Sequence, residues 1–159
     1  MSTITPEQFE SLLPLACQWA VEQERHILAA GAPLSPMALA DAQRVGVAQP
    51  RRVRILYVPE IPIPQHPALR AAAEQTQLIS PFTGGLTLRY GILIRADYAY
   101  SRAMVVHELG HTAQYERLGG FEPFLRQYLF ECLTIGYPEA PMEQEVVSLT
   151  AHICGDAQT

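Results

Sequence analysis

Residues 105–120 read VVHELGHTAQYERLGG, a stretch in which two histidines and a glutamate have the spacing H-E-x-x-H. Because an α-helix turns by roughly 100° per residue, positions four apart lie one above the other on the same side. His107 and His111 therefore direct their imidazoles to one side, as two nitrogen ligands of a single zinc ion require. Glu108 lies one residue round the helix, beside the metal position, where its carboxylate can accept a proton from water.

The rest of this helix is consistent with such a site. Ser101 predicts its N-terminus, and Gly119-Gly120 predicts its end. Gln114 and Leu118 continue the histidine side. The opposite side is predicted to be buried and comprises Val105, Val106, Leu109 and Ala113. Gly110 lies between the two histidines, and a glycine inside a helix costs roughly 1 kcal/mol relative to alanine, so we interpret it as leaving space near the metal.

Two histidines alone hold zinc poorly, so a third protein ligand is expected. The candidates lie in PEAPMEQEVVSLTAHIC, residues 138–154, where Pro141 predicts the start of a last helix that runs to about Cys154. Its buried side is predicted to comprise Val146, Val147, Leu149, Thr150 and Ile153. Glu143 falls within roughly 40° of the centre of that side, whereas Glu145 falls roughly 120° away. A buried carboxylate needs a partner that offsets its desolvation, so Glu143 is preferred and Glu145 remains the alternative.

The first part of the chain is predicted to be helical. A first helix is expected over 6–30, because Thr5 and Gln8 form the capping pattern T-x-x-Q. Pro14 lies inside this helix and predicts either a kink or a split into two pieces. A second helix is expected over 36–46, where Ser-Pro repeats the start signal and a glycine ends the pattern. Both helices are interpreted as scaffold.

The middle of the chain contains the predicted strands. The apolar, β-branched run VRILYV at 53–58 predicts a strand, and the proline-rich loop after it leads to a short helix around 68–76. The segment LTLRYGILIR at 86–95 alternates with period two and predicts one half-buried strand. A further helix is expected over 122–133. This order of elements predicts an α+β fold rather than a βαβ arrangement.

Composition and charge favour one globular domain over 1–159. Hydrophobic residues make up 48% and charged residues 17% of the 159 residues. We divide the domain into a helical scaffold (1–50), a small sheet (51–100) and the metal-site helices (101–155). The net charge of −5 leaves no basic face for nucleic acid, so a nucleic-acid partner is not expected.

The sequence also indicates where the protein functions. No stretch is apolar for long enough to cross a membrane, and the start, MSTITPEQFESLL, lacks the basic and apolar regions of a signal peptide. Cys17, Cys132 and Cys154 are too widely spaced to form a disulfide framework, so we expect reduced thiols. These features predict a cytoplasmic protein with no membrane partner, and they do not indicate its oligomeric state.

The motifs resemble the gluzincins, zinc peptidases with an H-E-x-x-H helix whose third ligand is a glutamate on a later helix. The matching stretches are HELGH at 107–111 and MEQEVV at 142–147. The downstream pattern of these families is often E-x-x-A-[DN]. This chain keeps the glutamate and has Val146 three residues later, but Val147 replaces the acidic or amide residue. The small size resembles minigluzincin-type domains, in which an edge strand, here 86–95, lies above the cleft.

This resemblance implies a zincin-like fold and a zinc-dependent metallopeptidase that acts on a peptide or protein. Zn²⁺ held by His107, His111 and Glu143 would lower the pKa of a bound water, and Glu108 would take its proton and pass it to the leaving amine. The developing oxyanion would need one more hydrogen-bond donor. The candidates for that donor are Tyr137, Tyr115 and His152.

Other interpretations of the sequence remain open. One is a zinc-binding protein without catalysis, in which the cleft recognises a partner; Glu108 argues against it, because a structural site needs no general base. Another is a scaffold protein without metal, in which residues 1–50 would matter most. The remaining histidines have the simpler interpretation of ordinary surface residues: His26, His66 and His152.

Overall fold

The computed structural model describes residues 4–155, and within this range the protein has the α+β fold that the sequence predicts. Its helices are α1 (Pro6–Ala30), α2 (Pro36–Val45), α3 (Pro67–Thr76), α4 (Arg102–Leu118), α5 (Phe121–Thr134) and α6 (Pro141–Cys154). Its strands are β1 (Ala32–Pro33), β2 (Arg54–Val58), β3 (Gly85–Leu88) and β4 (Gly91–Arg95). No helix among the described residues combines the length and hydropathy that crossing a membrane requires.

Helices α1, α2 and α4 begin at the capping residues that the sequence predicts. Thr5 and Gln8 form the reciprocal capping box of α1, and Ser35 accepts a hydrogen bond from the third residue of α2. α1 runs through Pro14 as one helix, so the split that this proline could have caused does not occur. Leu13 and Ala20, each 2% exposed, hold both halves of α1 against the core. Packing therefore offsets the hydrogen bond that a proline removes.

The four strands form one mixed sheet in the order β1-β2-β4-β3. β2 and β4 are parallel, whereas β1 pairs with β2 and β3 pairs with β4 in antiparallel fashion. The connection from β2 to β4 contains α3 and then β3, and β3 runs antiparallel to both strands, so β3 itself carries the chain back to the end of the sheet where β2 and β4 begin. The proline-rich loop and α3 join the end of β2 to the start of β3 at one end of the sheet, as the opposite directions of these two strands require. No helix crosses between the parallel strands, so the expectation of an α+β fold rather than a βαβ arrangement is confirmed over the described residues.

Residues 86–95 do not form the single strand predicted from their alternation. They form most of a hairpin, in which β3 turns into β4 at Arg89 and Tyr90. Arg89 has a φ of +60°, which glycine adopts more readily than a residue with a side chain. Glu24 of α1 holds this turn, because it accepts two hydrogen bonds from the Arg89 guanidinium at 2.8 and 2.7 Å and one from Tyr90 N at 3.1 Å.

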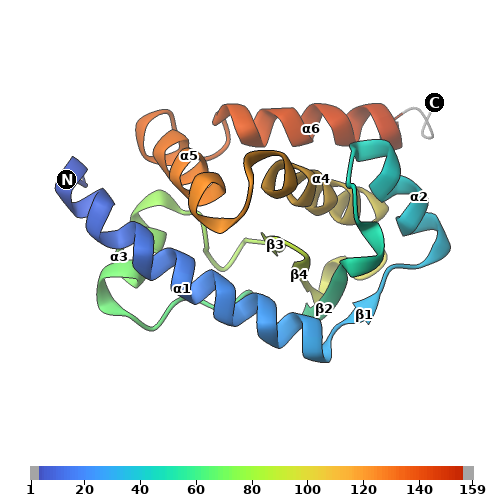
Figure 1. Ribbon diagram of the computed structural model, residues 1–159, viewed down its shortest axis with the longest axis horizontal. Coiled ribbons are helices and arrows are strands. Elements are labelled where there is room, and N and C mark those ends of the chain that lie inside the picture. Colours follow the sequence, from blue (N-terminus) through green and yellow to red (C-terminus); the bar gives the residue numbers. More distant parts are fainter. Residues whose placement is uncertain (1–3, 156–159) are drawn as a thin grey trace.

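β4 is buried on both faces. The alternation of its side chains therefore does not separate a buried face from an exposed one, and the prediction of a half-buried strand is wrong here. Ile92 faces the core between the sheet and α4, whereas Leu93 faces the core between the sheet and α1. Figure 1 shows these layers, with α1 crossing one side of the sheet and α4 lying on the other, beneath α6. The sheet is thus a middle layer, and α4 is a central helix with little free surface.

Candidate metal centre

α4 carries the H-E-x-x-H residues into the interior of the protein. Ser101 caps it by accepting a hydrogen bond from Met104 N at 3.1 Å, and Gly119 ends it in the left-handed conformation. The His107 side chain is 21% exposed and the His111 side chain 8%. The outer histidine therefore faces an opening, whereas the inner one is enclosed.

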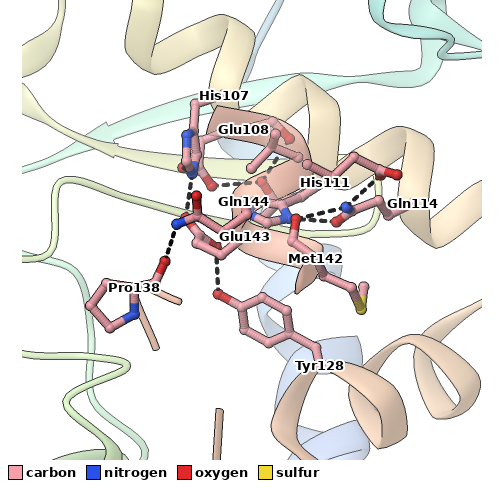
Figure 2. Close-up of polar contacts among 12 residues, drawn as sticks. His107, Glu108, His111, Gln114, Tyr128, Pro138, Met142, Glu143 and Gln144 are labelled. Carbon is pink, nitrogen blue, oxygen red and sulfur yellow. Dashed lines mark hydrogen bonds and ion pairs between the residues drawn. The ribbon is translucent and has the colours of Figure 1, made fainter. Parts of the chain in front are cut away.

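The structure brings Glu143 of α6 against both histidines. Glu143 Oε1 lies 2.7 Å from His107 Nε2, and Glu143 Oε2 lies 3.1 Å from His111 Nε2. Figure 2 shows the two rings and the carboxylate converging between α4 and α6. His107, His111 and Glu143 form a group that could hold a metal ion, with ligand atoms that all lie within 4.8 Å of one another.

Two contacts set the position of α6 relative to α4. A Cβ added to Gly110 would lie 2.7 Å from Val146 Cγ1, so only glycine permits this approach of the two helices. Gly110 is thus required by packing against α6, and not by space near a metal as the sequence suggested. At the start of α6, Glu131 of α5 accepts a hydrogen bond from Met142 N at 2.8 Å and replaces the missing side-chain cap.

The predicted buried side of α6 is correct in part. Val146 is fully buried, and Glu143 is 4% exposed. Val147 was predicted to be buried but is 45% exposed, because only a narrow side of α6 packs on α4. α6 lies on the outside of the fold, so its apolar stripe is narrower than the sequence pattern indicates.

The charges of the group are coupled. Burial alone would raise the pKa of Glu143, but hydrogen bonds from His107 and His111 hold it well below its usual value. Burial likewise opposes protonation of His111, whereas its hydrogen bond to Glu143 and the charges of Glu108 and Glu143 raise its pKa overall. Burial, together with the nearby Glu143 carboxylate, raises the pKa of Tyr128. Its hydroxyl therefore stays protonated and donates to Glu143 Oε2 at 2.9 Å.

The donor set and its spacing are compatible with zinc. Two imidazole nitrogens and one carboxylate are ligands that zinc takes in catalytic sites, where a fourth position is left open. Ligand atoms placed about 2.1 Å from a tetrahedral ion lie roughly 3.4 Å from one another. The nitrogen–oxygen distances of 2.7 and 3.1 Å are shorter than this by about 0.7 and 0.3 Å. Small rotations of these side chains would therefore admit the ion.

Glu108 lies beside this group and is held by β3. Its Oε1 accepts a hydrogen bond from the Thr87 hydroxyl at 2.8 Å, and its Oε2 lies 4.0 Å from His107 Nε2. A Cβ on Gly85 would lie 2.9 Å from Glu108 Oε2. The lack of a side chain at Gly85 therefore makes room for the Glu108 carboxylate.

Two cavities meet at the group and are both lined by Gly85, His107, Glu108 and Tyr137. One is mainly apolar, has a volume of about 130 Å³, and extends between α1, α3 and α5. The other is more open, with a volume of about 540 Å³, and its wall includes Phe82, which is 87% exposed. A ligand can therefore reach the group from the open side.

The three candidate oxyanion donors differ in which of the two cavities they line and in the partners of their polar groups. Tyr137 lines both cavities beside Glu108, whereas the Tyr115 hydroxyl donates to the Thr87 carbonyl oxygen at 3.2 Å. His152 is exposed on α6 and lines neither cavity. The remaining histidines, His26 and His66, are also exposed, and His66 caps α3 through Nδ1.

Glu145, the alternative ligand, is turned away from the histidines. Its Oε1 accepts hydrogen bonds from Gln114 Nε2 at 2.8 Å and from Arg117 at 3.0 Å. Gln114 Oε1 in turn lies 2.8 Å from His111 Nδ1. Sequence reasoning missed the roles of Gln114, Thr87 and Tyr128. Of these three residues, only Gln114 could have been identified from the sequence, because it lies three residues after His111 on the same helix and can contact its ring.

Comparisons with protein-family models, with curated proteins and with solved structures found no match. The chemistry of this site therefore rests on its own geometry.

Proposed function

We propose that this protein is a zinc-dependent metallopeptidase of the gluzincin type, with a zincin-like fold, that hydrolyses peptide bonds. The proposal rests on one observation: a carboxylate, that of Glu108, is held beside the His107–His111–Glu143 group without belonging to it. A purely structural metal site has no use for such a base. A cytoplasmic location belongs to the same proposal, because the cysteines are free thiols: Cys17, Cys132 and Cys154.

Zinc in this group would supply a Lewis acid that polarises a carbonyl and acidifies a water molecule. The residues of the chain provide the rest. Thr87 fixes Oε1 of Glu108, so Oε2 is the atom that can take a proton from the attacking water and return it to the leaving nitrogen. Tyr137, whose hydroxyl stays protonated because burial and the nearby Glu143 raise its pKa, is the donor best placed for the developing negative charge.

The edge of β3 gives a substrate chain a place to pair. Arg95 N donates to the Gly84 carbonyl at 2.8 Å, so residues 84, 86 and 88 face β4. In an antiparallel ladder the residues between them direct their backbone groups outward. The Thr87 carbonyl already accepts a hydrogen bond from the Tyr115 hydroxyl. The backbone of Gly85, next to Glu108, is therefore the part of this edge with which an extended peptide would pair.

Metal binding and peptide cleavage by purified protein, before and after chelation, test this function. Glu108→Gln should keep zinc and lower turnover by about 10²- to 10⁴-fold, because the general base is lost. Glu143→Gln should release zinc, whereas Glu145→Gln should cost far less affinity. Glu139→Gln, an exposed carboxylate just before α6, is the matched control and should change neither quantity.

Each alternative predicts a different result. Wild-type protein that binds zinc tightly but cleaves no peptide in a diverse library would indicate a zinc-binding protein without catalysis. Wild-type protein that binds no zinc would indicate a scaffold without metal. Equal zinc loss in Glu143→Gln and Glu145→Gln would contradict the assigned ligand set.

A further inference from the structure

Gln114 is a buried polar residue on α4 that the proposed reaction does not use. It is 1% exposed, and its carboxamide makes three hydrogen bonds. Gln114 Oε1 lies 2.8 Å from His111 Nδ1, and Gln114 Nε2 donates to the Met142 carbonyl at 2.9 Å and to Glu145 Oε1 at 2.8 Å. Figure 2 shows Gln114 next to His111, on the side away from His107.

The partners of Gln114 fix which way its amide points. A backbone carbonyl and a carboxylate paired with an arginine can only accept hydrogen bonds, so the NH₂ group must face Met142 and Glu145. The oxygen of the amide then faces His111, and because an amide oxygen cannot donate, His111 Nδ1 must carry the hydrogen. The remaining nitrogen, Nε2, is the one that faces Glu143 at 3.1 Å.

We propose that Gln114 is a positioning residue of the metal site. It selects the form of His111 that presents a bare Nε2 to the metal, and it ties that ring to the turn of α6 from which Glu143 projects. This inference rests on the proposed zinc site. It also gives Glu145 a role: the carboxylate that is not a ligand orients the amide of Gln114.

A merely structural role for Gln114 would depend on different atoms. Joining α4 to α6 requires only the NH₂ group, which reaches Met142 and Glu145. Positioning His111 requires only the oxygen. Glutamate keeps an oxygen acceptor and loses the NH₂ group, whereas methionine keeps the length of the side chain and loses both. The two roles therefore predict different orders of zinc affinity in Gln114→Glu and Gln114→Met.

The test measures the zinc dissociation constant by chelator competition, together with the unfolding free energy of the metal-free protein. If Gln114 positions His111, Gln114→Met weakens zinc about 10- to 100-fold, as loss of an outer partner of a histidine ligand does elsewhere. Gln114→Glu binds zinc at least as tightly as wild type, even where it is less stable. The double variant Gln114→Glu/Glu145→Gln exchanges amide and carboxylate and also keeps tight binding. Gln43→Met, the same change at an exposed position of α2, is the control and leaves zinc affinity unchanged.

A spectroscopic readout separates the two roles further. Long-range ¹H–¹⁵N NMR of the zinc-loaded protein should show His111 bound through Nε2, with a hydrogen on Nδ1. In Gln114→Met that hydrogen should exchange faster with water.

Three outcomes would overturn the inference. If Gln114→Met binds zinc like wild type, the inference fails while the proposed function stands. If Gln114→Glu and Gln114→Met lose affinity together, in proportion to stability, the residue only joins the helices. If wild-type protein binds no zinc, the proposed function fails and this inference fails with it.

Discussion

On two sides of α4 a glycine allows a close contact, and the two contacts position different residues. Towards α6, Gly110 lets Val146 approach to a distance at which a Cβ would lie 2.7 Å from its Cγ1. Towards β3, Gly85 lets the Glu108 carboxylate approach, where a Cβ would lie 2.9 Å from Oε2. At each glycine, the lack of a side chain sets how close a carboxylate lies to the histidines: that of Glu143 on the α6 side and that of Glu108 on the β3 side.

The difference between the two sides lies in what the contact positions. The Gly110 contact joins two helices and so places Glu143 against His107 and His111. The Gly85 contact joins a strand to a side chain and so places Glu108 alone. In the proposed function, metal binding and proton transfer would therefore depend on separate contacts, and substitutions should affect one without the other.

Gly110→Ala should have the largest effect. The added methyl group pushes Val146 away and costs about 1–3 kcal/mol of unfolding free energy through overpacking. The intrinsic helix preference of alanine offsets about 1 kcal/mol of this. Displacement of α6 moves Glu143, so zinc should bind about tenfold more weakly or worse. Denaturant unfolding and chelator competition measure both effects.

A second substitution controls for the steric cause. Val146→Ala on the Gly110→Ala background removes the atoms that clash and should recover most of the lost zinc affinity. If Gly110→Ala binds zinc like wild type, the contact between α4 and α6 does not set the ligand geometry.

A change of pH should have an intermediate effect and acts on the α6 side. Although burial opposes it, the hydrogen bond to Glu143 raises the pKa of His111, so in the metal-free protein the ring keeps its proton to a higher pH than a free histidine does. Zinc binds only the neutral imidazole. Affinity should therefore rise with pH up to this raised pKa and fall below it, by up to about tenfold per pH unit for one displaced proton.

Calorimetry in buffers of different ionisation enthalpy measures the protons released when zinc binds. Zinc affinity that stays constant over the range in which His111 titrates would show that the histidines are not ligands. Unfolding in urea cannot replace this measurement, because it reports the free energy of unfolding and not the number of protons released when zinc binds.

Gly85→Ala should have the smallest effect on zinc and a clear effect on catalysis. The methyl group meets the end of the Glu108 side chain, which Thr87 holds in place. Zinc affinity should stay within about twofold, whereas peptide hydrolysis should fall about tenfold or more because the base is misplaced. Gly155→Ala, where an added Cβ would meet nothing within 4 Å, is the control for both measurements. Parallel losses of zinc affinity and hydrolysis in Gly85→Ala would show that the two sides of α4 are not independent.

The helices were predictable because their signals are local. Thr5, Ser35 and Ser101 each accept a hydrogen bond from a backbone N–H three residues later, and Gly46 and Gly119 each end a helix at positive φ. These contacts lie within a few residues of the chain and are visible in the sequence.

The hairpin at β3 and β4 was not predictable in the same way. Arg89 takes a positive φ without the glycine or asparagine that usually marks such a turn. Its conformation is held by Glu24, 65 residues earlier, and by Thr112, whose hydroxyl donates to the Arg89 carbonyl at 2.8 Å. No pattern within 86–95 carries that information.

The sequence by itself determined which side of α4 carries His107 and His111, and it favoured Glu143 over Glu145, because helical periodicity fixes directions around an axis. Only the tertiary structure decided how far the helices stand apart, that Gly110 and Gly85 admit their neighbours, and that Gln114 holds His111. These features depend on distances between segments far apart in the chain. Close packing of the folded core sets such distances, and local sequence patterns do not encode them.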